Sequence, residues 1–393
     1  MDIINDLPRH TRAMYRTYYQ KCYPHETIYR MLTRNRPTES GERRRIGIQY
    51  RSHDVFVPES HPRATPAQFR HTTLLALVQS LHMGLFDARP AELSNPLYAA
   101  PHLEEKELVL DIDITDYERF CACRGEKRLC QFCWLHIEGA YLLLDHFLCE
   151  TMGYPRTNLL WVFSGGKGVH CLVNAPLAMR LSPRERTGLY SMLHIGREDD
   201  TKLRDYLLAH RRDSPDFMAR VLAHFYERVI RERAPFSLEL FERFCLEKVA
   251  ALYPALHTGL REAWLDGRES KRARLVTSTE LVGLSESERK WTILQRMETA
   301  LPPSVEIRPS VFLAFRLLYP MVDAGPLRMN HLIKLPFSIH PATGNVALPI
   351  EGESLLRTDV TRDFLSYRLA SAPEARGVLE KSVALLEKWV AQY

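Results

Sequence analysis

The sequence predicts a protein of the mixed α/β (α+β) class, with one core built on a mixed sheet, an inserted helical subdomain and a small cysteine-rich knuckle. An apolar strand, a glycine-rich turn and a second strand follow one another in "NLLWVFSGGKGVHCLVN", residues 158–174. From about residue 180 to 300 the pattern changes to long helices, and strand-like patterning returns at residues 328–350. This order of strands, helical insert and strands indicates one core that helices interrupt.

Length and composition limit the class of protein. The chain has 393 residues, of which 45% are hydrophobic and 26% charged, as in ordinary globular proteins of about two domains. No apolar window of about 18 residues predicts a membrane span, and the N-terminus has no apolar signal core, so we expect no secretion. The net charge of +5 is only a weak indication of polyanionic partners. Basic clusters at 43–45, 211–212 and 271–274 suit phosphate contacts as well as solvated faces.

The helices and strands before the insert follow from hydrophobic periodicity. A helix is predicted at residues 9–23, where Tyr15, Tyr18, Tyr19 and Cys22 recur at helical spacing. The pattern then predicts a strand and its continuation at 45–58, a helix at 65–81, an acidic strand from 108 and a long helix at 134–152.

The insert and the C-terminus read as helices with recognisable starts. Helical segments are predicted at 182–194, 216–230 and 237–252, and the capping box of Ser285 and Glu288 opens another. A last helix begins at Pro373, with Ser371 and Glu374 as its capping box and an apolar stripe at Leu379, Val383, Leu386 and Val390. We therefore divide the chain into a core at 1–180 and 300–370, an insert at 181–299 and a C-terminal helix at 371–393.

Two carboxylates end a strand that otherwise reads as buried, in "LVLDIDITDY" at residues 108–117. Alternate strand residues share a face, so Asp111 and Asp113 project to the same side. Two like charges in a partly buried place are unfavourable unless a cation lies between them, and a divalent metal with oxygen ligands is the usual one. A strand that ends in a solvated turn explains the same residues about as well.

Four of the eight cysteines lie within thirteen residues, in "CACRGEKRLCQFC". They are Cys121, Cys123, Cys130 and Cys133, and they predict a zinc-binding knuckle at 121–133, because zinc favours four thiolates in a tetrahedron. A secreted disulfide protein would spread its pairs along the chain. Four protein ligands leave no open position, so the predicted zinc is structural. The other cysteines read as small buried apolar residues.

Two further clusters combine glycines, basic residues and an acid. In "SGGKGVH", the glycines would let the backbone approach a phosphate, with Ser164, Lys167 and His170 beside it. The alternative is a tight glycine hairpin, and the spacing is not that of a Walker loop. A later cluster lies in "YPMVDAGPLRMNHLIKLPFSIHP", and its polar residues are Asp323, Arg328, His331, Lys334 and His340. These residues fit a metal-binding carboxylate beside basic residues that bind a phosphate. The competing interpretation is a zinc-binding pair of histidines.

Taken in order, "DIDITDY", the four cysteines with Trp134, "WVFSGGKGVH" and "NHLIKLPFSIHP" resemble the catalytic small subunit of archaeal and eukaryotic DNA primase, the eukaryotic form more closely. The resemblance runs from "YYQKCYP" to about Pro349 and implies a primase-type catalytic core. It implies that Asp111, Asp113 and Asp323 bind two divalent ions, Mg²⁺ or Mn²⁺. The nucleotide-binding residues that it implies are Ser164, Lys167, His170, Arg328, Lys334 and His340.

The chain departs from the family pattern at several positions. The family commonly has two basic residues where this chain has Gly166 and Lys167. The segment from Asp323 to Asn330 is one residue shorter, which shifts the register of Arg328. A family arginine that meets the nucleotide falls on Gln49, and Arg51, two residues on, faces the same side and is expected to replace it. The resemblance predicts ribonucleotide preference, although His82 stands where an acidic residue implicated in ribose recognition aligns.

The implied activity is a DNA-templated RNA polymerase that starts chains de novo and makes short RNA primers from NTPs on single-stranded DNA. The implied partners are a large subunit with an iron–sulfur cluster and, in eukaryotes, DNA polymerase alpha, in the nucleus. A stand-alone primase-polymerase that also extends with dNTPs is the alternative within the same fold. A zinc-containing nucleic-acid-binding module without catalysis, and a metal-dependent nuclease, are the alternatives from other classes.

Overall fold

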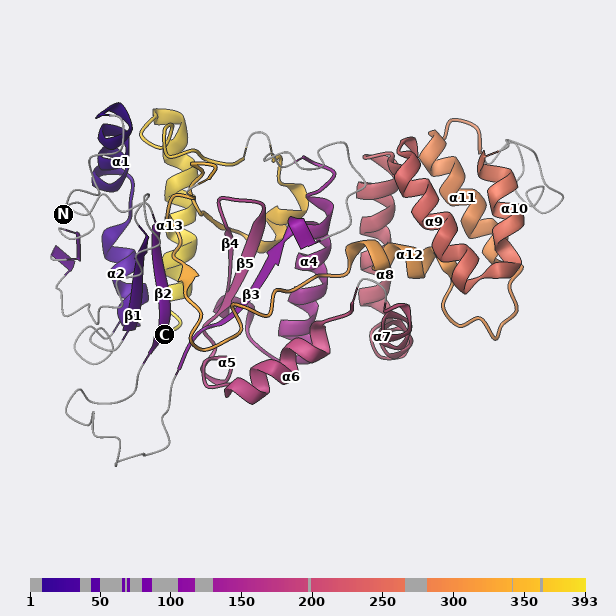
Figure 1. The fold of residues 1–393 in the computed structure, drawn as a ribbon, viewed down its shortest axis with the longest axis horizontal. Helices are drawn as coiled ribbons and strands as arrows, with labels where there is room; N and C mark the ends of the chain where they lie inside the picture. The colour runs from indigo at the N-terminus through magenta and orange to yellow at the C-terminus, as the bar shows by residue number, and fades with distance from the viewer. Residues whose placement is uncertain are drawn as a thin grey trace.

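The computed structural model describes residues 9–35, 44–49, 66–67, 69–70, 80–86, 105–116, 130–196, 199–265, 281–340, 342–360 and 363–393. The molecule is elongated, with the N-terminal helices at one end, the helical insert at the other and two small sheets between them (Figure 1). The predicted mixed α/β class is confirmed. Among the helices that the structure describes, none combines the length and the apolar character needed to cross a membrane.

The strands form two sheets. One has the order β1-β2-β6 and the other the order β3-β5-β4-β7. Their bounds are β1 (Arg44–Gln49), β2 (Ser80–Phe86), β3 (Leu108–Asp113), β4 (Leu159–Phe163), β5 (Gly168–Val173), β6 (Ile333–Lys334) and β7 (Pro349–Ile350).

Every strand pairing given for the described residues is antiparallel, so the predicted mixed sheet is wrong for this part of the chain. The short turn at 164–167 folds β5 back against β4 as a hairpin. Strand β5 lies between β3 and β4 in the sheet. Without it, β3 and β4 would be parallel neighbours.

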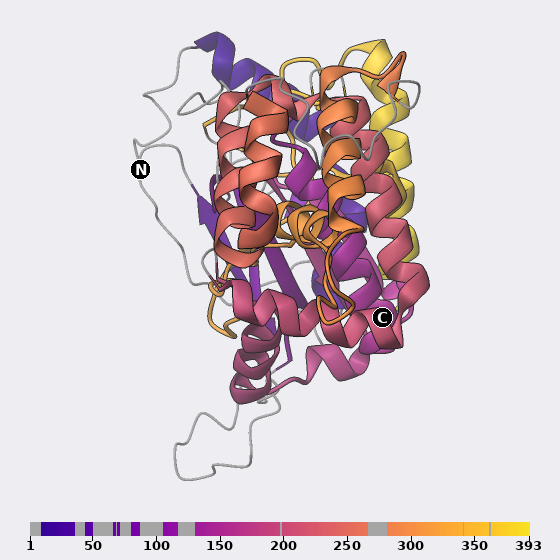
Figure 2. The ribbon, with the colours of Figure 1, turned by 90° about the vertical axis from the view of Figure 1, so that its right-hand side faces the viewer.

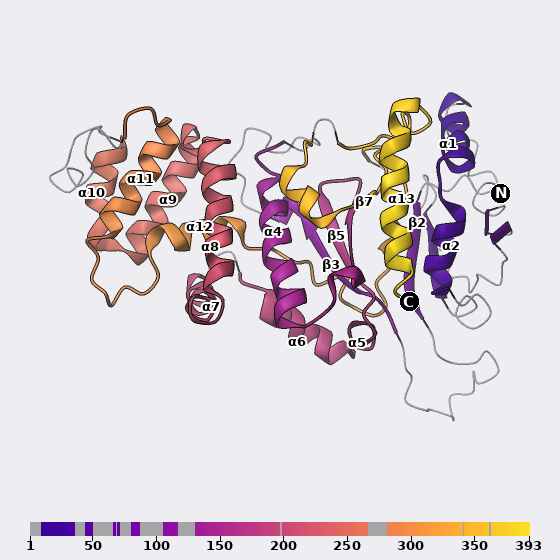
Figure 3. The same ribbon diagram turned by 180° about the vertical axis from the view of Figure 1, so that it is seen from behind.

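The helices surround these sheets. Their bounds are α1 (Arg9–Lys21), α2 (His25–Thr33), α4 (Leu135–His146), α5 (Pro176–Met179), α6 (Pro183–Leu193), α7 (Asp200–Asp213), α8 (Pro215–His224), α9 (Glu239–Leu252), α10 (Pro254–Leu265), α11 (Glu286–Glu298), α12 (Pro309–Leu318) and α13 (Arg376–Val390). Helix α13 lies between the N-terminal helices and the four-stranded sheet (Figure 3).

The two faces of β3 pack against different partners, as its alternating pattern requires. Leu108, Leu110 and Ile112 pack with α4, whose residues are buried on all sides. On the other face, Val109 shares a core with Met83 and Ile333 of the second sheet. The two sheets therefore meet through one apolar core, and the acidic end of β3 continues the face that points into it.

The helical insert has a core of its own, which continues into α12 and reaches α4. Seen from the insert end, its helices stand in front of the sheets (Figure 2). Trp134, at the start of α4, donates its indole N–H to the carbonyl of Leu355 (2.9 Å). This bond joins α4 to the segment that follows β7. These contacts do not test the predicted domain boundaries, which stay predictions.

Most of the predicted elements that fall on described residues are confirmed. The helix at 9–23 is α1, the hairpin at 158–174 is β4 and β5, and the helix at 134–152 is α4 with a π-helical turn at Phe147–Thr151. The capping box of Ser285 and Glu288 is present. The apolar stripe of the last helix is buried or packed in the core.

Two of the predicted elements need correction. The helix predicted at 65–81 is too long, because Ser80 already begins β2, which pairs with both β1 and β6. The capping box of Ser371 and Glu374 is also wrong. A 3₁₀ turn at Pro373–Ala375 precedes α13, and no side chain caps either start. The part of the predicted 45–58 strand beyond Gln49 lies outside the described residues.

Candidate active site

Backbone pairing brings the three predicted carboxylate residues to one place. Asp111 and Asp113 lie on the same face of β3. The backbone N–H of Asp323 donates to the carbonyl of Asp111 (2.9 Å), and the two residues form an antiparallel bridge. Residues opposite each other in such a bridge carry their side chains to the same side. The three aspartates therefore lie along one edge of the sheet, where its apolar face ends.

Local turns hold two of these carboxylates. Asp113 Oδ1 accepts from the backbone N–H of Thr115 (2.8 Å), and Asp323 Oδ1 accepts from that of Gly325 (2.9 Å). These are contacts of an Asp side chain to the backbone two residues on, which favour a turn directly after the acid. The second oxygen of each carboxylate, Oδ2, takes no part in this turn contact.

His170 flanks Asp111 on the other side. The two residues are partners in the β3–β5 pairing, and His170 Nε2 lies 3.5 Å from Asp111 Oδ1. His170 is buried, whereas the Asp111 side chain is about a quarter exposed, at 23%. Asp323, Asp111 and His170 therefore form one row across the end of the sheet.

The glycine turn between β4 and β5 is fixed by its own serine. Ser164 Oγ accepts from the backbone N–H groups of Gly166 (3.2 Å) and Gly168 (3.3 Å). The backbone N–H of Ile114 donates to the carbonyl of Lys167 (3.1 Å), which joins the turn to the end of β3. Gly165 has φ +79°, a conformation that side chains rarely adopt. The turn therefore lies directly beside Asp113.

Lys334 and His340 reach the same turn from the second half of the chain. Lys334 Nζ donates to the carbonyl of Ser164 (3.2 Å). Burial lowers the pKa of Lys334 to about 8, and the negative charge of Asp111 acts against that shift. Burial lowers the pKa of His340 to about 4; the charge of Lys334 acts in the same direction and Asp113 against it. At neutral pH, Lys334 is therefore mostly charged and His340 neutral.

Hydrogen bonds assign the tautomer of His340. Its Nδ1 accepts from the backbone N–H groups of Ala342 (3.3 Å) and Thr343 (3.4 Å), so the proton of the neutral ring is on Nε2. A Cβ atom on Gly166 would lie only 2.8 Å from that Nε2. The imidazole therefore occupies the space that a side chain at position 166 would need.

The remaining predicted nucleotide-binding positions differ in how far the structure describes them. Arg328 is exposed in the turn after Asp323, and its backbone N–H donates to the carbonyl of Gly325 (3.0 Å). His82 pairs with Lys334 through the β2–β6 backbone, which brings position 82 beside the basic residues. Arg51 lies outside the described residues, and for Gln49 only the backbone in β1 is described.

Half of the predicted zinc knuckle is described. Cys130 and Cys133 have their sulfurs 3.4 Å apart, and the backbone N–H of Cys133 donates to Cys130 Sγ (3.4 Å). That separation is far longer than a disulfide bond of about 2.05 Å. Cys121 and Cys123 lie outside the described residues. Within the described residues, no group of three or more His, Cys, Asp and Glu side chains is close enough to enclose a metal ion.

The charged stretch directly before β3 is not predicted from the sequence. Glu105, Lys106 and Glu107 precede the acidic strand, and Lys106 and Glu107 are buried. Glu107 forms a two-pronged ion pair with Arg44 at the start of β1 (2.9 and 2.7 Å). The signal that could have found them is a run of four charged residues, 104–107, that leads into an apolar strand with no turn residue between.

Comparison with known proteins identifies the family of this chain. Residues 110–351, more than half of the chain, match the family model of the DNA primase small subunit. The chain is 27% identical to the DNA primase small subunit of Saccharomyces cerevisiae, over 85% of this chain and 80% of the relative. It is 28% identical to that of Schizosaccharomyces pombe and 29% to that of Drosophila melanogaster, over 69% and 65% of this chain and 58% of each relative. The chain therefore belongs to the DNA primase small subunit family, the nucleotidyltransferases that synthesise RNA primers for DNA replication.

Proposed function

We propose that this chain joins ribonucleotides on a single-stranded DNA template at the row of carboxylates formed by Asp111, Asp113 and Asp323. The observation that carries this proposal is the backbone bond from Asp323 to Asp111, which unites two segments more than 200 residues apart in one acidic edge. A basic turn, Lys334 and His340 lie beside that edge. Acid next to base at the end of an apolar core suits a triphosphate with divalent cations.

The donor set fits Mg²⁺ or Mn²⁺. All three side chains offer oxygen only, although among the described residues neither these aspartates nor any other three such side chains are grouped closely enough to enclose an ion. Oxygen donors suit a hard cation that keeps several waters and takes its other oxygens from the triphosphate. Two divalent ions bound there would assist attack by the 3′-hydroxyl and departure of pyrophosphate. His170, buried beside Asp111, excludes water from one side of the carboxylate row.

The residues opposite the carboxylates bind the triphosphate in this proposal. Lys334 supplies a positive charge at neutral pH, and His340 supplies the Nε2–H donor. Ser164 and Lys167 belong to the glycine turn, and the Ser164 hydroxyl fixes the backbone of this turn by accepting from two of its N–H groups. Such fixed donors stabilise negative charge that develops during transfer without having to reorganise. Arg328 and Arg51 complete the proposed nucleotide site.

One observation favours the second candidate, a stand-alone primase-polymerase that extends with dNTPs. Position 82 lies next to Lys334, and it is a histidine where an acidic residue implicated in ribose recognition aligns. We keep ribonucleotide use as the primary proposal because of the family to which the chain belongs.

The proposed cofactors and partners follow from family membership. A structural zinc ion would be held by Cys121, Cys123, Cys130 and Cys133, and the N–H bond to Cys130 Sγ favours its thiolate form. The proposed partners are a DNA template, NTPs, the RNA primer, a large subunit with an iron–sulfur cluster and DNA polymerase alpha, in the nucleus. Removal of zinc is expected to unfold the knuckle without altering the carboxylate edge.

Primer synthesis on a single-stranded DNA template tests the proposal. Purified protein is supplied with Mg²⁺ or Mn²⁺ and with either NTPs or dNTPs, and a pre-made RNA primer is provided in a parallel reaction. We expect metal-dependent RNA products. Long DNA products would instead support the primase-polymerase, and degradation of the template without nucleotide addition would support a nuclease. Binding of DNA with no incorporation, even on the pre-made primer, would contradict catalysis.

The contact between Gly166 and His340 yields a specific prediction. Gly166→Ala is expected to displace the imidazole and remove one hydrogen bond to the triphosphate, which corresponds to about 1 kcal/mol and a fivefold rise in the KM for NTP. Gly188→Ala in α6 is the matched control, because a Cβ there meets nothing within 4 Å. Steady-state extension of a primer measures both. An unchanged KM in Gly166→Ala would remove His340 from the proposed nucleotide site.

A further inference from the structure

Lys106 is a buried lysine that clasps the turn following Asp323. It is only 1% exposed, and its Nζ donates to the carbonyl of Pro326 (2.9 Å) and to that of Arg328 (2.6 Å). Both carbonyls belong to the turn that begins at the carboxylate of Asp323. The lysine therefore holds this turn from a position more than 200 residues earlier in the chain.

The backbone of Lys106 is itself fixed. Its N–H donates to the carbonyl of Met179 (3.1 Å), and its carbonyl accepts from Arg186 Nη2 (2.6 Å). The next residue, Glu107, is locked by its buried ion pair with Arg44. Lys106 is thus a rigid arm that extends from the strand carrying Asp111 to the turn carrying Arg328.

Burial of a charged lysine costs free energy, so a buried lysine usually has contacts that only its amino group can make. Burial lowers the pKa of Lys106 to about 7, the charge of Arg186 acts in the same direction, and Glu107 opposes the shift. An apolar side chain of similar length would fill the same space without this desolvation cost. What it could not do is hold two carbonyl oxygens at a fixed distance.

The clasped turn is also compact at its start. A Cβ atom on Gly325 would lie 3.1 Å from Asp323 Oδ2 and 3.5 Å from the ring of His331, so the turn folds back on the carboxylate. Arg328 lies in this fold with its side chain exposed. The direction of that side chain depends on where the backbone of residue 328 is held.

We propose that Lys106 is a positioning residue for nucleotide binding: by fixing the carbonyl of Arg328, it directs the guanidinium of Arg328 toward the triphosphate at the carboxylate edge. The inference rests on the proposed function, in which Arg328 contacts the nucleotide. In this role Lys106 acts through the backbone carbonyl of Arg328, to which its Nζ donates.

The insert contains a matched control. Lys202 Nζ likewise donates to two carbonyls, those of Ser191 (2.6 Å) and His194 (2.5 Å), among helices away from the carboxylates. Lys106→Met and Lys202→Met therefore remove the same kind of clasp in two places. Only the first is expected to change nucleotide binding.

The test combines these variants with Arg328→Ala in a double-mutant cycle, with the KM for NTP and kcat measured by primer extension. Lys106→Met is expected to raise the KM about tenfold, as the loss of one charge-assisted contact does, with kcat within about threefold of wild type. Lys202→Met is expected to leave the KM unchanged. In the Arg328→Ala background, Lys106→Met is expected to add no further rise, because its effect passes through that side chain.

The inference would be overturned if Lys106→Met raised the KM by the same factor in the Arg328→Ala background as in the wild type. It would also be overturned if the KM of Lys106→Met were no different from that of Lys202→Met. If Lys106→Met does not fold, Lys106→Gln retains N–H donors and allows the same cycle, with a smaller rise that again vanishes in the Arg328→Ala background. Asp111→Asn is included throughout. Incorporation that survives it would mean that the proposed site is wrong, whereas an inactive Asp111→Asn beside a neutral Lys106→Met would reject only the positioning role.

Discussion

Asp111→Asn is expected to lower the rate of nucleotide incorporation by at least about 10³-fold, the loss expected when a main source of transition-state charge stabilisation is removed. Asp111 is the central residue of the site: Asp323 bonds to its backbone, Asp113 shares its face and His170 Nε2 lies 3.5 Å from its carboxylate. Asparagine has the same shape and keeps the bridge to Asp323, because that bridge uses only backbone atoms. The loss should therefore appear in kcat with the protein still folded.

Incorporation on a primed template measures this effect, with the unfolding midpoint as the test for folding. Asp213→Asn is the matched control, because Asp213 is an exposed aspartate at the end of α7 that pairs with Arg212. It should incorporate nucleotides at the wild-type rate. A folded Asp111→Asn protein with more than about a tenth of the wild-type rate would show that the carboxylate row is not the metal site.

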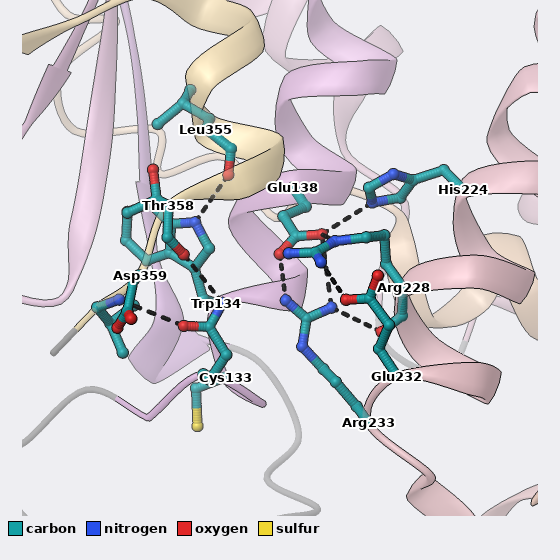
Figure 4. A network of polar contacts seen from close by, with 12 residues as sticks. Cys133, Trp134, Glu138, His224, Arg228, Glu232, Arg233, Leu355, Thr358 and Asp359 are labelled. Atoms are coloured by element: carbon teal, nitrogen blue, oxygen red, sulfur yellow. Dashed lines mark hydrogen bonds and ion pairs between the residues drawn. The ribbon is translucent and has the colours of Figure 1, made fainter. Parts of the chain in front are cut away.

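Glu138→Gln is expected to give the largest loss of stability, about 3–5 kcal/mol, as when one member of a buried charge cluster is removed. Glu138 lies on α4 with no exposed side chain, and three basic residues surround it (Figure 4). Arg233 bonds to Oε1, His224 Nε2 lies 2.9 Å from Oε2, and Arg228 Nε lies 3.6 Å from it. Glutamine would leave two guanidinium groups without a buried counter-charge.

The control for this variant lies in the same cluster. Glu232 also pairs with Arg228, but it is half exposed, so Glu232→Gln should cost less than about 1 kcal/mol. Urea unfolding of both variants measures the difference. Because Glu138 joins α4 to the end of α8 and to the π-helical segment Phe225–Arg231 that follows it, the first unfolding transition of Glu138→Gln should include the helical insert. Equal midpoints for the two variants would mean that the cluster contributes little to stability.

How far the sequence could predict this molecule depends on the distance over which each feature is determined. The pairing of β4 with β5 was predictable, because residues 164–167 allow only a tight return. The shared face of Asp111 and Asp113 was predictable from strand alternation alone. The capping box at Ser371 failed because the local pattern does not exclude a 3₁₀ turn at Pro373.

Contacts between distant segments could not be predicted in this way. Nothing near Lys106 indicates that its partners are carbonyls about 220 residues later. Glu138 and Arg233 are separated by 95 residues, and each alone reads as an ordinary surface charge. The row of carboxylates was expected from the family resemblance, but its backbone link, from Asp323 to Asp111, required the structure.

The place of β3 at the end of the sheet order has a consequence for synthesis on the ribosome. One edge of β3 pairs with β5. Within the described residues, the other edge is paired only by the single bridge between Asp111 and Asp323. The nascent chain must therefore wait for about 210 further residues, roughly 10–40 s at usual elongation rates, before that edge is covered. During this time an apolar strand with an open edge is exposed to other chains. Chaperones that hold nascent chains are accordingly expected to bind between the emergence of β3 and that of Asp323.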